Sequence, residues 1–217
     1  MDNELSIGYD TAVDVATNAL DMLQPTAASH RRAMILEVMG RDAGHIALNS
    51  GIAGGADVIL IPERPYSIKS IAKHIENIRS NGRNHALIVV AEAVKKEDGS
   101  KATVKYIDGQ IRLGGIGSYI GDKIYKMTNA ETRVTVLGHV QRGAQPTHRD
   151  RLIASAFGVH AVDLIAQEKF SRVVVWQNRG VTDVDLDSIA GKSKTVRDND
   201  PLIKVAEGLG IYVGEIN

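Results

Sequence analysis

The sequence predicts a Rossmann-like α/β fold, a three-layer sandwich in which a mostly parallel sheet has helices on both faces. Two observations lead to this fold class. Short apolar runs alternate with segments of helical periodicity, which is the pattern of a parallel sheet with crossover helices. The chain also has 217 residues, 43% hydrophobic and 24% charged, enough apolar material for a globular core. We expect a single α/β domain over residues 1–217.

Helical periodicity and apolar runs alternate through the first half of the chain. Apolar residues from Val13 to Leu23 lie three or four positions apart, as on one face of a helix, and we expect Pro25 to end that helix. The apolar runs that follow are too short for ordinary helices and are bounded by glycines. The expected elements are a helix at 10–23, a strand at 33–39, a helix at 42–53, a strand at 56–61, a helix at 68–78 and a strand at 85–91.

The second half of the chain continues the alternation after a charged interruption. Residues 95–101 are almost all charged or small, so we expect a solvated loop there. Apolar residues from Ile116 to Met127 recur at helical spacing. The expected elements are a helix at 116–127, a strand at 133–138, a helix at 150–166 and a strand at 172–176, with one short helix in the tail after Val181, which contains Pro201.

Charge balance and the lack of cysteine exclude several kinds of protein. Lysine and arginine total 26, as do aspartate and glutamate, so no global positive field would attract nucleic acid. The absence of cysteine excludes disulfides, thiolate metal sites and cysteine nucleophiles. No apolar run approaches the roughly 18 residues of a membrane span, and the polar first nine residues hold no signal-peptide core. We therefore expect a cytoplasmic protein that binds neither nucleic acid nor membrane.

Polar residues follow several predicted strands at their carboxyl ends. Gly40 and Arg41 follow one strand, Glu92 another, and 138–143 a third. Ligands of parallel sheets bind at that edge, and a guanidinium beside glycine suits phosphate oxygens. A phosphorylated small molecule is therefore the predicted ligand. The alternative is that each arginine pairs with a surface carboxylate.

Other polar residues each allow two interpretations. His139 and Arg142, three residues apart in a predicted turn, could face one ligand, but His139 could equally be structural. Arg32 and Arg133 lie at the opposite, amino-terminal edge of their strands. They are either solvated or reach a ligand of a neighbouring subunit. Glu92 could accept hydrogen bonds from sugar hydroxyls, or serve as a cap or ion-pair partner.

Familiar nucleotide and metal motifs are absent from the sequence. It contains no Gly-x-Gly-x-x-Gly after a strand, no Walker lysine motif and no histidine pair at metal-ligand spacing. Acidic residues at strand ends are too few to hold a catalytic Mg²⁺. No metal site is therefore predicted, and a nicotinamide-linked dehydrogenase of this fold class is disfavoured.

Three segments resemble the 6-phosphofructokinase family: Val38-Met39-Gly40-Arg41-Asp42-Ala43-Gly44, Ile52-Ala53-Gly54-Gly55-Ala56-Asp57 and the run from Glu131 to Gly143. The resemblance extends from about residue 7 to the C-terminus. The segment 112–117 is similar to the bacterial branch that contains ATP- and pyrophosphate-dependent members. The family transfers a phosphoryl group to the 1-hydroxyl of fructose 6-phosphate in glycolysis, using Mg²⁺, between two α/β domains. This chain resembles the carboxyl-terminal, sugar-phosphate-binding half.

The resemblance implies roles for individual residues. It implies that Met39, Gly40 and Arg41 contact the substrate and the transferring phosphoryl group, that Glu92 holds sugar hydroxyls, that His139 and Arg142 bind the 6-phosphate, and that Arg32 and Arg133 reach it across a subunit interface. Asp2, in Asp2-Asn3-Glu4, is similar to the family's catalytic base. The expected partners are thus fructose 6-phosphate and further copies of the chain, in a dimer or tetramer with shared sites.

The resemblance also implies what the chain lacks. Asp57 and Arg83 match an effector site, but Gln24, Asn81 and Asn84 replace basic residues there, so we expect weak allosteric control or none. The family's donor-binding half, with its phosphate loops and metal carboxylate, has no counterpart in these residues. We expect Mg²⁺ and ATP or pyrophosphate to act in the complete enzyme, with none bound tightly here and no activity of this chain alone. The alternative is a non-catalytic phosphosugar-binding or regulatory module.

Overall fold

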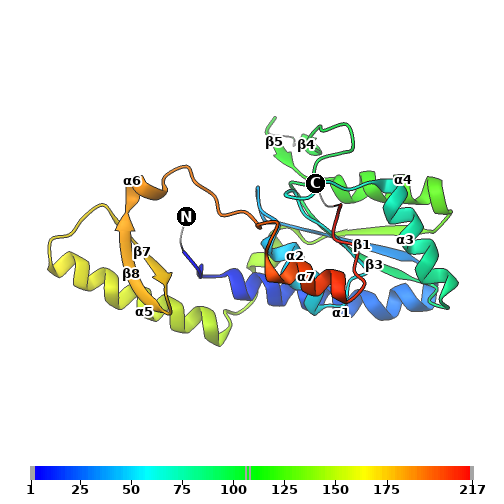
Figure 1. The fold of residues 1–217 in the computed structure, drawn as a ribbon. Coiled ribbons are helices and arrows are strands. Elements are labelled where there is room, and N and C mark those ends of the chain that lie inside the picture. The colour runs from blue at the N-terminus through cyan, green and yellow to red at the C-terminus, as the bar shows by residue number, and fades with distance from the viewer. Residues whose placement is uncertain (1–2, 106, 108, 216–217) are drawn as a thin grey trace. The chain divides into compact units, whose positions relative to one another are not determined.

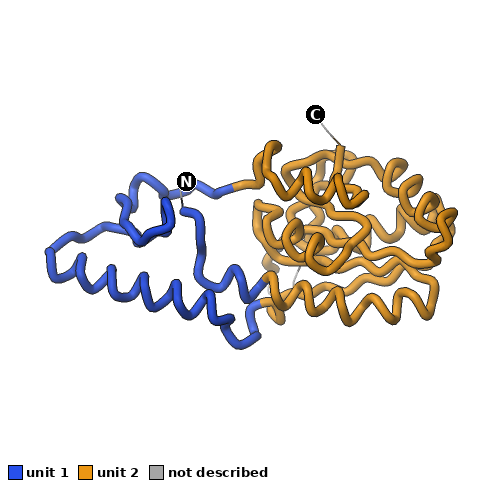
Figure 2. The backbone as a smooth tube through the Cα atoms, turned by 60° about the horizontal axis from the view of Figure 1, so that its bottom comes forward, with its two compact units in different colours: residues 1–12, 142–194 blue, residues 13–141, 195–217 orange. Residues whose placement is uncertain are grey.

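The computed structural model describes residues 3–105, 107 and 109–215 and divides them into two compact units (Figure 2). The smaller unit combines Met1–Ala12 with Arg142–Lys194, and the larger combines Val13–Gln141 with Thr195–Asn217. The single domain expected over residues 1–217 stays a prediction.

A four-stranded parallel sheet forms the centre of the larger unit. Its strands are β1 (Ala33–Val38), β2 (Val58–Leu60), β3 (Ala86–Ala91) and β6 (Thr132–Val136), in the spatial order β2-β3-β1-β6. Every residue of β1, β2 and β3 is buried. Burial on both faces is what the continuous apolar runs of these strands predict.

Helices cover both faces of this sheet (Figure 1). One layer contains most of α1 (Tyr9–His30), α2 (His45–Ala53) and α7 (Pro201–Gly208), and the other contains α3 (Ile68–Ser80) and α4 (Ile116–Thr128). The helix α2 contacts β2 and β3, whereas α4 contacts β1 and β6. The predicted three-layer α/β architecture is therefore confirmed. No helix within the described ranges is long and apolar enough to cross a membrane.

Two glycines allow α4 to approach the sheet closely. A Cβ atom at Gly117 would lie 2.9 Å from Val134 Cγ1, and one at Gly121 would lie 3.2 Å from Ile35 Cδ1. Ile116, Ile120 and Ile124 of the same helix are fully buried. Met127, which the spacing placed on the same apolar face, is half exposed instead.

The first helix does not end at Pro25, contrary to the prediction. The helix α1 continues through Pro25 to His30. A proline inside a helix removes one hydrogen bond and costs about 3 kcal/mol. The last turn nevertheless contributes Ala27 to the core with no exposed surface, and Arg31 then ends the helix with a left-handed φ of 57°.

The second helix begins later than the expected Asp42. The helix α2 starts at His45, after a turn in which Arg41 has a left-handed φ of 51°. Helical geometry cannot extend back through that conformation. The backbone of 39–41 is instead held by side chains from other parts of the larger unit.

The strand expected at 172–176 does not belong to the parallel sheet. In the smaller unit, β7 (Arg172–Gln177) pairs antiparallel with β8 (Gly180–Asp185). Asn178 and Arg179 between them both have positive φ, as in a two-residue type I′ turn. A second hairpin, β4 (Thr103–Lys105) with β5 (Ile111–Leu113) in the larger unit, was not predicted.

The other two helices of the smaller unit are α5 (His148–Ala166) and α6 (Leu186–Ile189). The first confirms the helix expected at 150–166. The single short helix expected in the tail is accompanied by β8 and α6, so the tail has more regular structure than its weak periodicity indicated.

The carboxylate of Asp150 organises the start of α1 within the smaller unit. Its Oδ1 accepts a hydrogen bond from the Gly8 amide at 2.9 Å, and its Oδ2 accepts from the Thr11 amide at 2.8 Å and from the Thr11 hydroxyl. Burial alone would raise the pKa of Asp150, but these hydrogen bonds outweigh it and the pKa lies below the ordinary aspartate value. A buried anion thus stabilises the helix N-terminus.

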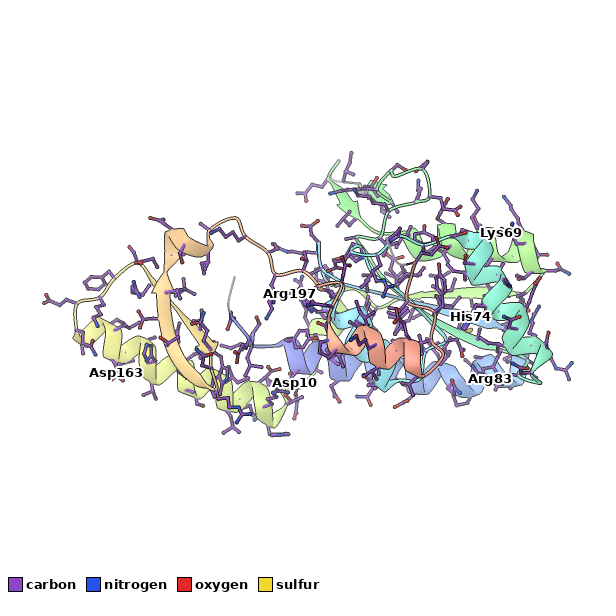
Figure 3. The ribbon with its side chains drawn as sticks, viewed as in Figure 1. Asp10, Lys69, His74, Arg83, Asp163 and Arg197 are labelled. Carbon is purple, nitrogen blue, oxygen red and sulfur yellow. The ribbon has the colours of Figure 1, made fainter. Side chains whose placement is uncertain are left out.

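We expect Asp150→Asn to lower the free energy of unfolding by about 1–3 kcal/mol at pH 7, because one buried donor loses its acceptor. The folded-state pKa is depressed, so the stabilisation is complete above the ordinary aspartate pKa of about 3.9 and is lost as pH falls below it. Urea unfolding at several pH values should show the difference from wild type shrinking below about pH 4. Asp163→Asn, an exposed change on α5 (Figure 3), is the control and should have little effect.

Candidate functional site

Three loops leave the parallel sheet at its carboxyl edge. The strand β1 ends with Val38 paired to Ala91, the last residue of β3, and β6 ends beside β1. The residues that follow are 39–41, Glu92 and the 3₁₀-helix η1 (Gly138–Arg142). These include most of the site residues predicted from the sequence, and the sheet register brings their loops to one edge.

Two side chains hold the loop 39–41 through its backbone. The Oε1 atom of Glu92 accepts hydrogen bonds from the amides of Gly40 at 3.1 Å and Arg41 at 3.0 Å. The side chain of Gln141 accepts from the Met39 amide at 3.0 Å and donates to the Met39 carbonyl at 3.3 Å. Every backbone N–H of this loop is therefore bound by a side chain.

The basic side chains of the carboxyl-edge loops have no anionic partner among the described residues. Within the described ranges, Arg41 and His139 make no ion pair or hydrogen bond through their side chains, and both are exposed. The same holds for Arg142, so the alternative that these arginines pair with surface carboxylates is not observed. The Oε2 atom of Glu92 also accepts no hydrogen bond from the described residues. These groups are available to an anionic, hydroxylated ligand.

The predicted site residues are divided between the two units. Arg142 is the last residue of η1 and belongs to the smaller unit, whereas Met39, Gly40, Arg41, Glu92 and His139 belong to the larger. Asp2, the candidate base, lies outside the described residues. The common frame at the carboxyl edge therefore consists of 39–41, Glu92 and η1 up to Gln141.

Arg32 and Arg133 meet at the opposite, amino-terminal edge of the sheet. Arg32 Nη2 lies 3.0 Å from Glu131 Oε1, and Arg133 donates to the same oxygen. The hydrogen bond from Arg32 and the positive charge of Arg133 hold the pKa of Glu131 below its ordinary value. The structure therefore brings these two arginines together, but away from the carboxyl-edge loops of their own chain.

The candidate effector residues neutralise each other. Arg83 Nη2 donates to both oxygens of Asp57, at 2.7 Å and 2.6 Å, and the Leu87 amide also donates to Asp57 Oδ2 at 2.8 Å. Asp57 is buried, and its main-chain oxygen lies 3.1 Å from His74 Nε2. Figure 3 shows His74 on α3 and Arg83 beyond the end of that helix. Neither charge is free for an effector.

Two structurally important side chains were not recognised as such from the sequence. Gln141 lies in the run from Glu131 to Gly143 that resembles the family, but no role was predicted for it. Glu37 interrupts an otherwise apolar strand, and its buried carboxylate accepts from the Gly115 amide at 3.0 Å and the Gly117 amide at 2.9 Å at the start of α4. A charged residue inside a wholly buried strand is the signal that could have identified it.

The described residues form no metal site, and a cavity in the larger unit is lined by residues other than those predicted for the ligand site. No group of three or more His, Asp or Glu side chains among them is arranged to hold a metal ion. A cavity of about 320 Å³ in the larger unit is lined by Ile61, Pro62, Glu63, Arg64, Pro65, Tyr66, Val94, Lys95, Lys96, Glu97 and Gly99. None of the predicted site residues lines it.

Comparisons with known proteins identify a family. The model for the phosphofructokinase family matches residues 1–165. The chain is 57% identical to ATP-dependent 6-phosphofructokinase 1 of Nostoc sp., covering 98% of this chain and 59% of that protein. It is 53% identical to ATP-dependent 6-phosphofructokinase 1 of Synechocystis sp., covering 97% and 58%. The chain therefore spans somewhat less than three fifths of the length of these relatives.

Solved structures of phosphofructokinases have the same fold. Phosphofructokinase from Saccharomyces cerevisiae is 30% identical with a TM-score of 0.73, over 86% of this chain and 24% of that chain. The pyrophosphate-dependent phosphofructokinase from Nitrosospira multiformis has a TM-score of 0.77 over 99% of this chain and 58% of that chain. Its 19% identity supports a shared fold alone.

Because Asp57 and Arg83 already bind each other, we expect no micromolar binding of ADP or phosphoenolpyruvate at this position. Each lost charge-assisted hydrogen bond is worth about 1.5–3 kcal/mol to an anionic ligand. Calorimetric titration should give a Kd of about 1 mM or weaker. Micromolar binding that is abolished by Arg83→Ala but kept by Arg79→Ala, an arginine of α3 without a contact to Asp57, would contradict this expectation.

Proposed function

The chain belongs to the phosphofructokinase family, and we propose that it supplies the fructose 6-phosphate site of a 6-phosphofructokinase. The observation that supports this most directly is the frame at the carboxyl edge of the sheet. There Glu92 and Gln141 hold the loop 39–41, while Arg41 and His139 have no anionic partner in the part of the chain that the structure describes. An unpaired guanidinium and an unpaired imidazole beside a carboxylate oxygen suit a phosphorylated sugar.

Each residue of the frame has a distinct task in this proposal. Glu92 uses Oε1 to hold the loop and Oε2 to accept a hydrogen bond from a sugar hydroxyl. His139 and Arg142 bind the 6-phosphate. Arg41 stabilises the negative charge of the transferring phosphoryl group, so catalysis consists of positioning and charge stabilisation. The proton of the 1-hydroxyl requires a base, for which Asp2 remains the candidate.

ATP is the proposed phosphoryl donor. The relatives that are 57% and 53% identical are both named ATP-dependent, whereas the pyrophosphate-dependent structure is 19% identical. The described residues offer no ligand set for Mg²⁺, so no step of this proposal runs through a metal held by them. Donor binding is assigned to parts of the complete enzyme other than these residues.

The position of Arg32 and Arg133 supports a shared site. Both lie at the amino-terminal edge of the sheet, on Glu131, where they cannot join the carboxyl-edge frame of the same larger unit. In a homo-oligomer they would instead face the 6-phosphate bound by a second copy. We therefore propose that a complete fructose 6-phosphate site contains residues of two chains.

We expect the 217 residues alone to give no phosphoryl transfer, because the sequence contains no recognisable donor phosphate loop and the described residues offer no Mg²⁺ ligand set. A coupled assay with ATP, Mg²⁺ and fructose 6-phosphate, and a second with pyrophosphate, should show no turnover above background at stoichiometric protein. Turnover in a preparation shown to be free of contaminating kinase would refute this expectation. Binding without turnover is also what a non-catalytic phosphosugar-binding module would show.

We expect fructose 6-phosphate to bind more tightly to a dimer than to one chain. A single chain retains about 4 kcal/mol of binding free energy, a millimolar Kd, and two partner arginines should tighten this at least about tenfold. Arg142→Ala and the double variant Arg32→Ala/Arg133→Ala should each bind poorly by calorimetry. A mixture of the two should recover affinity, because a mixed dimer contains one intact site.

The control mixture contains an Arg149→Ala chain in place of the Arg142→Ala chain. Arg149 is exposed, and its Nη1 lies 3.8 Å from Asp10 Oδ1. Removing this side chain should therefore leave the binding of fructose 6-phosphate unchanged. Chain exchange must be demonstrated independently, for example with two differently labelled chains. If chains exchange and the mixture still binds no better than either parent, the site is not shared.

A further inference from the structure

The side-chain amide of Gln141 forms two hydrogen bonds with the backbone of Met39, as paired residues of neighbouring strands do. Its Oε1 accepts the Met39 amide at 3.0 Å and its Nε2 donates to the Met39 carbonyl at 3.3 Å. Gln141 is only 3% exposed. A buried primary amide that both donates to and accepts from one residue has a chemical specificity that no carboxylate or apolar side chain shares.

This pairing connects two segments that carry proposed ligand-binding groups. Gln141 lies two residues after His139 in η1, and Met39 lies two residues before Arg41. Glu92 holds the other two amides of the loop and comes from the end of β3. Gln141 is therefore the side chain through which η1 is hydrogen-bonded to the loop, in addition to the β1 and β6 ladder beneath them.

We propose that Gln141 is a positioning residue of the fructose 6-phosphate site, fixing the separation between His139 and Arg41 so that both contact one ligand. This inference rests on the proposed function. Gln141 itself is buried and touches the backbone, so it acts through the residues it places. A displacement of about 1 Å in a reacting site can cost about a hundredfold in rate. Groups that bind one ligand depend on their separation in the same way.

The test exploits the difference between an amide and a carboxyl group. In Gln141→Glu, the ionised carboxylate can accept from the Met39 amide but repels the Met39 carbonyl. The protonated acid can donate to that carbonyl and restores both bonds. Burial and the facing carbonyl oxygen raise the pKa of the introduced carboxyl above the ordinary glutamate value of about 4.3. Pairing should therefore be lost at high pH and recovered as pH falls.

Fructose 6-phosphate affinity is measured by calorimetry between about pH 5.5 and pH 8 for wild type, Gln141→Glu and Gln145→Glu. Gln145 is exposed, so its substitution introduces the same charge without touching Met39. We expect Gln141→Glu to bind about tenfold more weakly than wild type at pH 8 and to approach wild type at the lowest pH. Arg41, Glu92, His139 and Arg142 are common to all three proteins, so the Kd ratio to wild type isolates residue 141.

Gln141→Met, with similar volume and no amide, should bind weakly at every pH and serves as the test if Gln141→Glu does not fold. Amide hydrogen exchange should become faster at Met39 in Gln141→Met and remain slow in Gln145→Glu. Wild-type affinity in folded Gln141→Glu at pH 8, or in Gln141→Met, would overturn the positioning role. A loss of affinity in Gln141→Glu that is the same at all pH values would also overturn it. If wild type and Gln145→Glu both fail to bind the sugar phosphate, the proposed function fails instead.

Discussion

The candidate site depends on the hydrogen bonds that hold the backbone amides of residues 39–41. A loop that leaves the end of a buried strand must find acceptors for its N–H groups, and here they come from Glu92 and Gln141. This requirement accounts for the left-handed conformation of Arg41 and for the late start of α2. It also leaves the guanidinium of Arg41 exposed, since only its backbone is held.

Buried carboxylates at helix N-termini stabilise both units in the same way. Glu37 accepts two amides at the start of α4, and Asp150 accepts two amides and a hydroxyl at the start of α1. In each case the charge is neutralised by hydrogen-bond donors and not by a cation. The helix dipole and the donors together make burial of the anion tolerable.

Hydrophobic pattern alone predicted the parallel sheet, because continuous apolar runs occur where strands are buried on both faces. The predictions from this pattern were wrong where contacts between residues distant in sequence outweighed a local sequence preference. Pro25 did not end α1, since Ala27 is buried beyond it, and the run at 172–176 joined a hairpin. For the site, arginine beside glycine identified the carboxyl edge. Gln141 could not be found in this way, because burial of one amide depends on the tertiary arrangement of two loops.

The ion pairs at the amino-terminal edge affect how any anion would bind there. Arg32 and Arg133 are both occupied by one oxygen of Glu131, so they do not form an empty cationic pocket. An arriving phosphate would exchange for this carboxylate, and only the difference between the two partners would contribute to affinity. Such an exchange favours a dianion over a monoanion. In the proposed shared site, Glu131 would thereby discriminate between ligands by charge, because a singly charged competitor only replaces one monoanion with another.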